Sequence, residues 1–515
     1  MKKSVIILSF LLLSSTFIYS QPLKFSKVLS SVQTVQASCI RPAENDAYII
    51  SGSAGQRGLI LKSDLNGNVI WNKTFYNYTH IYPDICFKSI VVSNDSSYVA
   101  AGSCYDSLSS RTSIFCLKLN FNGDVIWSKT LKFTGLESTA NSIQQTLDSG
   151  YIITGYGCLN NGNDNRIILA KLDISGILQW AKQLISGSND EIGLSVIQAP
   201  DSGFLLTGYN TYSGDPILTK LTQDGMVSWS KIFQPSVSGN NYNSVYTGDG
   251  IVFNSSGILI KLDFSGNILW NKVFNTTMPF NYCQIVPGLY KTSDGGFAFI
   301  SESECYNSSI IKTDSNGNLN WAKNLAIIAS DVIETNDKGF MVLGNGPMCA
   351  VKSGEYSKDD SFLSAGLIKM DSLGNGLDCV FDKNVDSDTG TIGVVPNVYT
   401  LVDGATISTF NTIIDPIVVN SSFGCVPWVG GISDIKTENS IIVLPNPTTG
   451  KINIQTSQHF GKIKTVEIFD GTGQLRKLIT DKFTDTDIGF LASGLYFIVV
   501  TNFDNERLTG KIIKE

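Results

Sequence analysis

The stretch KLDISGILQWAKQL at Lys171–Leu184 returns almost unchanged as KLDFSGNILWNKVF at Lys261–Phe274. Each copy has a lysine, a glycine five residues later and a tryptophan nine residues after the lysine. The lysine and its glycine occur in seven copies, at Lys62, Lys118, Lys171, Lys220, Lys261, Lys312 and Lys369. The first six copies have the tryptophan, whereas the seventh has Asp378 in its place. A phrase that returns about every fifty residues indicates a repeat architecture.

A second phrase precedes the first in the same register. It reads DSGYIITG at Asp148–Gly155, DSGFLLTG at Asp201–Gly208 and DKGFMVLG at Asp337–Gly344, and it is degenerate in the fifth copy, near Asp249–Phe253. Chance does not keep two phrases in one register through seven copies. We therefore infer seven units of one structure.

Each unit predicts four short antiparallel strands. The first strand precedes the DxG turn and the second follows it, the third ends in the lysine phrase, and the fourth contains the tryptophan. Asp and Gly supply the backbone conformations of tight turns, and β-branched and aromatic residues fill the runs between them. Seven such units predict an all-β fold, a seven-bladed β-propeller. A β-helix is the alternative, but its repeats are shorter and lack two hairpin turns each.

The seventh unit lacks its tryptophan strand, and the start of the mature chain supplies a match. LKFSKVL at Leu23–Leu29 aligns with IWSKTL at Ile126–Leu131, with Phe25 in the tryptophan position. An N-terminal strand that completes the last blade removes two exposed edges and joins the ends of the ring. We predict a propeller over residues 21–378, with the tryptophans packed between blades rather than bound to a ligand.

The first twenty residues, MKKSVIILSFLLLSSTFIYS, are typical of a secretory signal peptide. A membrane anchor is the alternative, but the apolar run is short for one, and we predict no transmembrane segment in the mature chain. Outside the cytoplasm, cysteines form disulfides. Three pairs are candidates, namely Cys283 with Cys305, Cys104 with Cys116, and Cys379 with Cys425.

Composition argues against several function classes. The net charge is -7, whereas a nucleic-acid partner requires a basic surface. The chain has two histidines, His80 and His459, which excludes a three-histidine zinc centre.

No catalytic residue is predicted, although a pair of glycosidase carboxylates leaves no mark in a sequence. No cofactor is expected either, and the alternative is calcium at the acidic loop with Asp382, Asp386 and Asp388.

The strand order sorts the turns onto two faces of the propeller. The DxG and KxDxxG turns share one face and are uniform, whereas the links on the other face vary in length. Variable loops on a rigid scaffold usually contain the binding site. Tyrosines on this face suit stacking on sugars or contacts with proteins, and capping of the blade ends is the alternative. The candidate ligand-binding residues are Tyr76, Tyr78, His80, Tyr82, Tyr105, Tyr212 and Tyr282.

The repeat stops after Asp378. Residues 379–437 are predicted to form a connector. The alternative is a short layer of strands linked by a disulfide between Cys379 and Cys425. Residues 438–515 contain PNPTTGKINI, VEIFDGTG, SGLYFIVV and LTGKIIKE, and their short alternating runs predict a small β-sandwich.

These phrases in combination resemble the type A C-terminal sorting domain of the type IX secretion system in Bacteroidetes. The resemblance covers about residues 441–515. It implies passage through the periplasm, recognition by the outer-membrane translocon and its sortase, and either release or attachment at the outer cell surface. The repeats resemble uncharacterised propeller-like regions of such cargo proteins, and that likeness implies no activity.

Three functional hypotheses follow. The favoured one is a secreted or cell-surface binding or adhesion protein whose loop face binds a glycan or a protein. The second is a glycan hydrolase or lyase built on a propeller, and the absence of a recognisable catalytic motif counts against it. The third is a structural surface component with no small ligand.

Overall fold

The computed structural model describes two compact units, residues 1–427 and 428–515. Its described residues are 24–31, 34–76, 85–106, 111–159, 164–186, 190–234, 242–255, 257–274, 288–304, 307–325, 327–346, 364–376, strand segments of 380–423, and 441–514 with short gaps. The predicted signal peptide, residues 1–20, lies outside them. Within the described residues no helix is long and apolar enough to cross a membrane.

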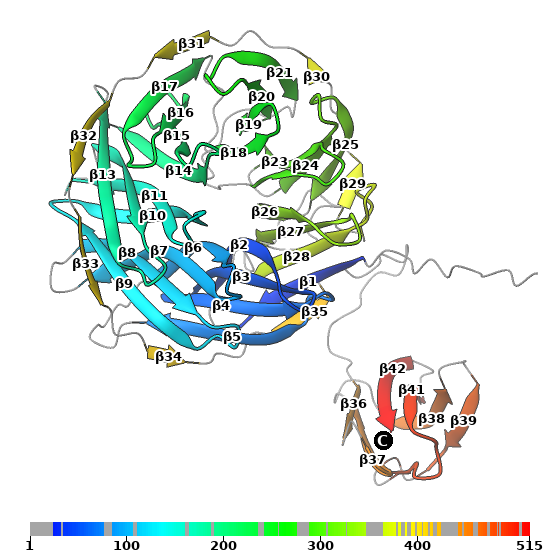
Figure 1. Ribbon diagram of the computed structural model, residues 1–515. Coiled ribbons are helices and arrows are strands. Elements are labelled where there is room, and N and C mark those ends of the chain that lie inside the picture. The colour runs from blue at the N-terminus through cyan, green and yellow to red at the C-terminus, as the bar shows by residue number, and fades with distance from the viewer. Residues whose placement is uncertain are drawn as a thin grey trace, which may run out of the picture. The chain divides into compact units, whose positions relative to one another are not determined.

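Seven antiparallel sheets form a ring of blades in the first unit, which confirms the predicted seven-bladed propeller (Figure 1). Blade 1 contains β2 (Val35–Ala43), β3 (Ala47–Ala54), β4 (Arg57–Asp64) and β5 (Val69–Tyr76). Blade 2 contains β6 (Ile85–Val92), β7 (Tyr98–Asp106), β8 (Arg111–Leu119) and β9 (Val125–Phe133). Blade 3 contains β10 (Glu137–Gln145), β11 (Tyr151–Cys158), β12 (Asn165–Leu172) and β13 (Leu178–Ser186). The first strand of each blade is the innermost, next to the ring axis.

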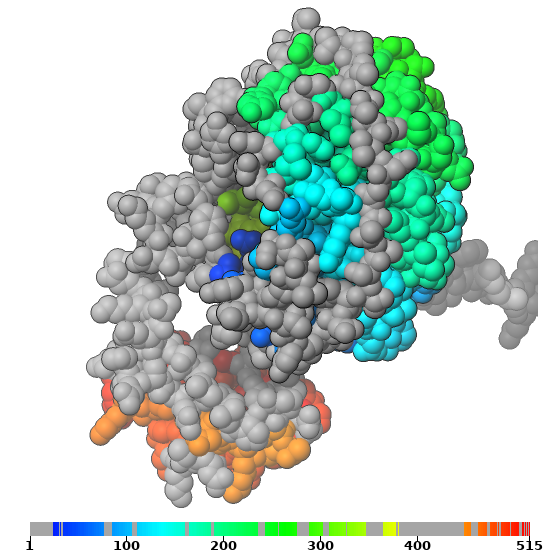
Figure 2. Space-filling model, turned by 90° about the vertical axis from the view of Figure 1, so that its left-hand side faces the viewer, coloured from blue at the N-terminus to red at the C-terminus, as the bar shows by residue number. Residues whose placement is uncertain are grey.

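The remaining blades follow the same order, and the side view shows neighbouring blades in succession from cyan to green (Figure 2). Blade 4 contains β14 (Glu191–Gln198), β15 (Phe204–Asn210), β16 (Pro216–Leu221) and β17 (Val227–Gln234). Blade 5 contains β18 (Tyr242–Thr247), β19 (Gly250–Ser255), β20 (Ile258–Leu262) and β21 (Ile268–Phe274). Blade 6 contains β22 (Leu289–Lys291), β23 (Phe297–Glu304), β24 (Asn307–Thr313) and β25 (Leu319–Leu325). Blade 7 contains β26 (Ile328–Glu334), β27 (Phe340–Asn345), β28 (Ala365–Met370) and β1 (Phe25–Ser30).

The N-terminal strand closes the ring, as the sequence predicts. β1 pairs antiparallel with β28, and Phe25 lies opposite Lys369. This is the register in which Trp180 lies opposite Lys171 in blade 3. Phe25 is therefore the structural equivalent of the repeated tryptophan, and it is buried.

The repeated tryptophan and glycine meet across the boundary between neighbouring blades. A Cβ atom on Gly176 of blade 3 would lie 3.1 Å from the Trp127 ring of blade 2. The glycine has a φ of +74°, a conformation that favours glycine in any case. The same contact joins Trp71 to Gly123, Trp180 to Gly225, Trp229 to Gly266, Trp270 to Gly317, Trp321 to Gly374, and Phe25 to Gly67. The tryptophans thus pack between blades, as predicted.

A lysine lies two residues after each of these aromatic residues, and in blades 7, 1 and 4 it contacts the turn of the neighbouring blade. Lys27 Nζ donates to Asn68 Oδ1 at 3.1 Å, Lys73 Nζ contacts Asp124 at 3.0 Å, and Lys231 Nζ donates to the Gly266 carbonyl at 2.7 Å. The lysine recurs in every blade, at positions 27, 73, 129, 182, 231, 272 and 323. The W-x-K spacing was visible in the sequence and is a further repeat feature.

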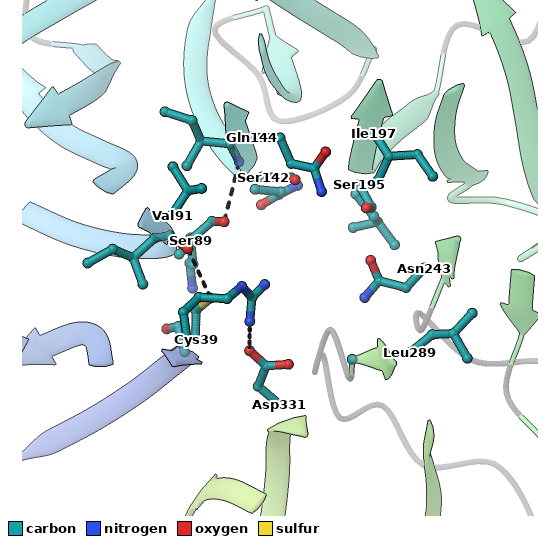
Figure 3. A pocket seen from close by; sticks show the side chains of 18 of the residues that line it. Cys39, Ser89, Val91, Ser142, Gln144, Ser195, Ile197, Asn243, Leu289 and Asp331 are labelled. Carbon is teal, nitrogen blue, oxygen red and sulfur yellow. Dashed lines mark hydrogen bonds and ion pairs between the residues drawn. The ribbon is translucent and has the colours of Figure 1, made fainter. Parts of the chain in front are cut away.

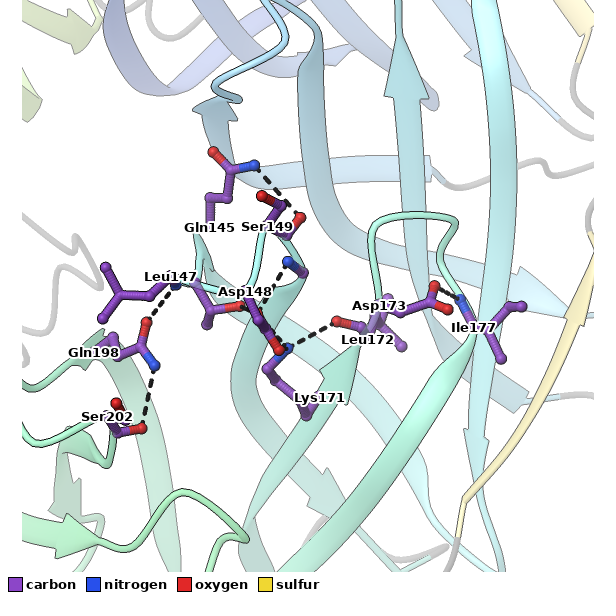
Figure 4. Close-up of polar contacts among 12 residues, drawn as sticks. Gln145, Leu147, Asp148, Ser149, Lys171, Leu172, Asp173, Ile177, Gln198 and Ser202 are labelled. Carbon is purple, nitrogen blue, oxygen red and sulfur yellow. Dashed lines mark hydrogen bonds and ion pairs between the residues drawn. The ribbon is translucent and has the colours of Figure 1, made fainter.

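An ion pair joins the two repeated phrases inside each blade. In blade 3, Lys171 Nζ contacts Asp148 at 2.9 Å and donates to the Leu172 carbonyl at 3.1 Å (Figure 4). The other phrase lysines contact Glu44, Asp95, Asp201, Asp249, Asp294 and Asp337 at 2.6–3.4 Å. The lysine is buried in all seven blades, so it needs an acidic partner beside it. The spacing between the two phrases is constant because the lysine of one forms an ion pair with an acidic residue at the turn of the other.

Hydrogen bonds between turns also join neighbouring blades. The Leu147 N–H in the DxG turn of blade 3 donates to Gln198 Oε1 of blade 4 at 2.7 Å (Figure 4). Gln198 Nε2 donates in turn to the Ser202 carbonyl of its own blade at 3.1 Å. Ser293 of blade 6 is held in the same way by Glu334 of blade 7, at 2.8 Å.

The acidic partner in blade 6 predicts an acid-dependent loss of stability. Burial by itself raises the pKa of Asp294, but hydrogen bonds from Lys312, Thr292 and the Gly296 N–H outweigh it and lower the pKa from 3.8 to about 2. This contribution is complete above pH 3.8 and is lost as the pH falls through about 2. We expect Asp294→Asn to lower stability at neutral pH by about 1 kcal/mol or less, because Asp294 is 57% exposed.

Thermal melts across the acid range check this expectation. The curves of Asp294→Asn and of the unchanged protein should approach each other as the pH falls from 3.8 toward about 2, and they should meet below about 2, where the carboxylate is protonated in both the folded and the unfolded protein. A gap between the two curves that stays constant down to this pH would contradict the assignment.

The segment predicted as a connector instead adds a fifth strand to every blade. Its strands run around the ring in reverse order, and Figure 1 shows them on the outer edges of the blades. They are β29 (Val380–Asp382), β30 (Ser387–Asp388), β31 (Gly393–Pro396), β32 (Tyr399–Asp403), β33 (Ala405–Thr409), β34 (Ile413–Asp415) and β35 (Asn420–Phe423). They pair with β25, β21, β17, β13, β9, β5 and β1 respectively. We call these seven strands the belt.

The belt covers backbone that would otherwise be exposed. Without it, the outermost strand of each of the seven blades would present unpaired N–H and C=O groups, which are templates for pairing with other chains. We expect truncation after Asp378 to cause concentration-dependent self-association, measured by light scattering. Truncation after Thr437 retains the belt and should behave as the full chain does. Equal behaviour of the two truncations would contradict this role.

The second unit is a small two-sheet structure with its own core. One sheet contains β36 (Ile441–Leu444), β37 (Lys451–Thr456) and β40 (Thr486–Asp487). The other contains β39 (Leu475–Ile479), β38 (Ile463–Asp470), β41 (Gly494–Asn502) and β42 (Arg507–Lys514). Alternate residues of these strands form the core, among them Ile452, Ile454, Val466, Ile468 and Ile498. This arrangement matches the predicted β-sandwich.

Candidate functional site

The innermost strands of the seven blades surround a cavity of about 1240 Å³ on the ring axis (Figure 3). Residues of β2, β6, β10, β14, β18, β22 and β26 all line it. Most of the polar lining side chains are hydroxyls and amides, and they alternate with aliphatic and tyrosine side chains. The cavity therefore offers many neutral hydrogen-bonding groups beside apolar surface.

One residue from each blade forms what we call the inner ring: Cys39, Ser89, Ser142, Ser195, Ser244, Gly288 and Asp331. Five of these follow a register shift, which indicates a β-bulge at the same place in their strands. A β-bulge redirects a side chain within a strand. Six of the seven precede Ile or Val, so a small polar residue before a β-branched one was the available sequence signal.

The inner ring links blade to blade. Ser89 Oγ of blade 2 accepts a hydrogen bond from the Ile143 N–H of blade 3 at 3.3 Å. Asp331 Oδ2 of blade 7 accepts one from the Ile40 N–H of blade 1 at 3.0 Å, and Cys39 Sγ lies 3.8 Å from the Ile90 carbonyl. Burial raises the pKa of Cys39 to about 12, so this thiol stays protonated at neutral pH. These contacts connect neighbouring inner strands of the cavity wall.

Charge in the cavity wall is concentrated on one side. Arg41 Nη1 contacts Asp331 Oδ2 at 2.5 Å, across the boundary between blades 1 and 7 (Figure 3). Burial alone would lower the pKa of Arg41, but Asp331 raises it above its ordinary value. Lys88 of blade 2 is the third charged residue in the lining, and it is exposed.

The opposite side has buried hydroxyls that lack a partner. Ser244 Oγ and the Tyr246 hydroxyl, both on β18, have no hydrogen-bond partner among the described residues. β18 pairs with β19 without the register shift found in five other inner strands. An unpaired buried polar group lowers stability, so these two hydroxyls are a cost to the folding of blade 5.

The predicted ligand-binding residues do not gather at this cavity. Tyr76 lies at the end of β5 in blade 1, with the Arg57 guanidinium 4.4 Å from its ring centre. Tyr105 lies on β7 in blade 2, and Tyr212 lies between β15 and β16 in blade 4, where it is 82% exposed. None of the three is among the cavity residues. Tyr78, His80, Tyr82 and Tyr282 lie outside the described residues.

The structure corrects one predicted disulfide. Cys116 is a free cysteine that lies opposite Ala101, whereas Cys104 lies opposite Ser113. The three-residue offset places the two side chains on opposite faces of the sheet, so they cannot bond. Cys283, Cys305, Cys379 and Cys425 lie outside the described residues.

The acidic segment proposed for calcium is divided between two blades. Asp382 lies on β29 beside blade 6, and Asp388 lies on β30 beside blade 5, while Asp386 lies outside the described residues. No group of three or more His, Cys, Asp or Glu residues in the described part of the chain could hold a metal ion. The DLNGN turn at Asp64–Asn68 also contains an acidic residue, and turn hydrogen bonds account for it: Asp64 Oδ1 accepts the Asn66 and Asn68 N–H groups at 2.9 and 2.8 Å.

Several solved structures resemble the chain at low sequence identity. A protein of unknown function from Bacteroides caccae has a TM-score of 0.35 and 9% identity, and the match covers 59% of this chain and 94% of that one. PorZ, an essential surface component of the type IX secretion system of Porphyromonas gingivalis, has a TM-score of 0.29 and 12% identity over 92% of this chain. Prolyl oligopeptidase B from Galerina marginata has a TM-score of 0.39 and 11% identity over 92% of this chain.

Structural similarities as weak as these do not indicate a function. All three TM-scores are low, and the chain spans only 58% of the PorZ structure and 56% of the prolyl oligopeptidase structure. No curated protein matches the chain.

The C-terminal unit has a specific match. Residues 442–515 match the family model of the secretion system C-terminal sorting domain. These residues are the strands β36–β42 and their shared core. The match agrees with the resemblance found in the sequence. The chain is therefore a cargo protein of type IX secretion, exported to the outer cell surface or secreted.

Proposed function

We propose that this chain is a secreted or cell-surface binding protein that holds a glycan in the central cavity of its propeller. The cavity lining is the observation that supports the proposal. Its hydroxyl and amide side chains, which include Ser142, Gln144 and Asn243, match the hydroxyl groups of sugars. Val91, Ile197 and Leu289 lie among them and offer apolar contacts to the C–H faces of sugar rings (Figure 3).

The size of the cavity fits the same proposal. Its volume of about 1240 Å³ exceeds the roughly 300–1000 Å³ of ordinary small-molecule sites, which leaves room for more than one sugar unit. The inner ring and the ion pair at the blade 1–7 boundary fix the wall before a ligand arrives. A preformed wall lowers the entropy lost on binding.

We also propose that the variable loops contact the part of the glycan outside the cavity. Tyr76, Tyr105 and Tyr212 lie in three different blades; Tyr76 and Tyr105 are near the ends of β5 and β7, and Tyr212 is in the link between β15 and β16. An exposed tyrosine such as Tyr212 suits stacking on a sugar ring. These contacts would add affinity without forming the central site.

Filling the cavity should abolish binding. Gln144→Trp places a large side chain in the cavity from β10, and we expect at least a tenfold loss of affinity, because a ligand and the indole compete for one space. The matched control is Gln179→Trp, which makes the same change at an exposed position on β13 of the same blade. The mature chain would first be screened on a glycan array, and the best glycan would then be titrated by calorimetry.

The control variant should bind like the unchanged protein, and both variants should keep its melting temperature. Equal binding by Gln144→Trp and the unchanged protein would place the ligand outside the cavity. Absence of binding to every glycan on the array would refute the proposed function itself.

A further inference from the structure

The cavity has an excess of positive charge in a chain that is negative as a whole. Arg41, Lys88 and Asp331 are the three charged residues among those that line it. Their charges sum to one positive charge, whereas the net charge of the chain is -7. Both cations lie on neighbouring inner strands, β2 and β6. This local sign attracts anions into a protein that otherwise repels them.

The carboxylate of Asp331 is already occupied by the protein. Its Oδ1 accepts the Val332 N–H at 2.9 Å, and its Oδ2 accepts the Ile40 N–H at 3.0 Å and Arg41 Nη1 at 2.5 Å. Gly288 leaves room for it, because a Cβ atom there would lie 2.4 Å from Oδ1. Asp331 is 9% exposed, so the protein shields most of its negative charge from a ligand.

Arg41, in contrast, keeps donors for a ligand. Its hydrogen bonds within the described residues use Nη1, to Asp331 and to the Ile40 carbonyl. The guanidinium group has five N–H donors in a fixed plane, and the side chain is 39% exposed. Asp331 therefore orients the guanidinium plane and leaves Nε and Nη2 without a partner among the described residues. A planar fork of this kind matches a carboxylate or a sulfate.

We infer that the glycan in the cavity is acidic, and that its anionic group binds to Arg41 with support from Lys88. Lys88 is the bulged residue of β6 and is exposed in the cavity wall. The inference rests on the proposed function and specifies its ligand class, a carboxylated or sulfated glycan.

The first test compares glycans. The mature chain is applied to an array of neutral, carboxylated and sulfated oligosaccharides, and each carboxylated hit is compared with its methyl ester. We expect acidic hits, binding that weakens with added salt, and binding that is weaker but still measurable after esterification. Hits confined to neutral glycans would overturn this inference and leave the proposed function intact. Preference for carboxylated over sulfated probes, or the reverse, identifies the anionic group.

The second test compares variants on the best acidic hit. Lys88→Gln removes one cation, and the double variant Arg41→Gln with Asp331→Asn removes both charges of the pair without leaving a buried carboxylate unpaired. A charged hydrogen bond corresponds to a roughly 10- to 100-fold loss of affinity for the double variant. Lys291→Gln is the matched control, because Lys291 is exposed on β22 and does not line the cavity.

The variants also separate recognition from a structural role at the blade 1–7 boundary. Affinity for the neutral counterpart of the hit should not change in the double variant or in Lys88→Gln. Equal losses for the acidic and neutral forms would show that the pair only stabilises the wall, and would overturn the inference. Lys88→Gln remains informative if the double variant fails to fold, since Lys88 is exposed, and unchanged acidic affinity in it would then count against the inference.

Discussion

Deletion of residues 21–30 should lower the melting temperature of the propeller more than any single substitution in it. The deletion removes β1, which pairs with β28 on one side and with the belt strand β35 on the other. It also removes Phe25, the buried aromatic residue that packs on Gly67 of blade 1. Loss of one buried phenylalanine alone costs about 3–5 kcal/mol, and here the boundary between the last and first blades is lost as well.

Thermal melts of the mature chain with and without these residues check this expectation. The matched control is deletion of residues 438–515, which belong to the separate C-terminal unit and contain its core. We expect the propeller transition to stay in place in the control and to shift strongly, or vanish, without β1. An unchanged transition in the β1 deletion would show that the ring does not depend on this closure.

Trp127→Ala should cost about 3 kcal/mol, at the lower end of the range for large aromatic residues, because Trp127 is half-buried. Its indole covers Gly176 of the next blade, and Nε1–H donates to the Ile174 carbonyl there at 3.4 Å. Its ring also meets Tyr151 edge-on, with 6.1 Å between ring centres. Removal of the indole therefore opens a gap between blades 2 and 3.

Chemical denaturation measures this loss, with Tyr212→Ala as the control. Tyr212 is 82% exposed, and a surface substitution of this kind usually changes stability by less than about 0.5 kcal/mol. If Tyr212→Ala unfolds the protein while Trp127→Ala leaves it intact, the tryptophans do not pack between blades as the structure has them.

The belt illustrates what a repeat pattern misses. Its strands are two to five residues long, and neither phrase of the repeat occurs in them. They pair through backbone groups, which every residue type except proline provides in full. The sequence therefore predicted a connector between residues 379 and 437, although this segment covers the outer edge of all seven blades.

The cavity shows the same limit for the candidate site. The inner-ring residues have a weak sequence signal, a small polar residue before Ile or Val, but a β-bulge decides which side chains face the axis. The predicted binding tyrosines that the structure describes lie on three blades and do not line the cavity. Arg41 and Asp331 are 290 residues apart in the chain, so their ion pair exists only because β1 brings blade 7 beside blade 1.

The sequence by itself determined the number of blades, the closure by the strand at Leu23–Leu29 and the sorting domain, because these depend on local or periodic features. The tryptophan, glycine and lysine recur since each blade makes the same contact with the next. The tertiary structure alone decided the belt, the central cavity and the charged pair in its wall. Each of these joins segments far apart in the chain through backbone pairing or one unrepeated contact, and such contacts leave no period in a sequence.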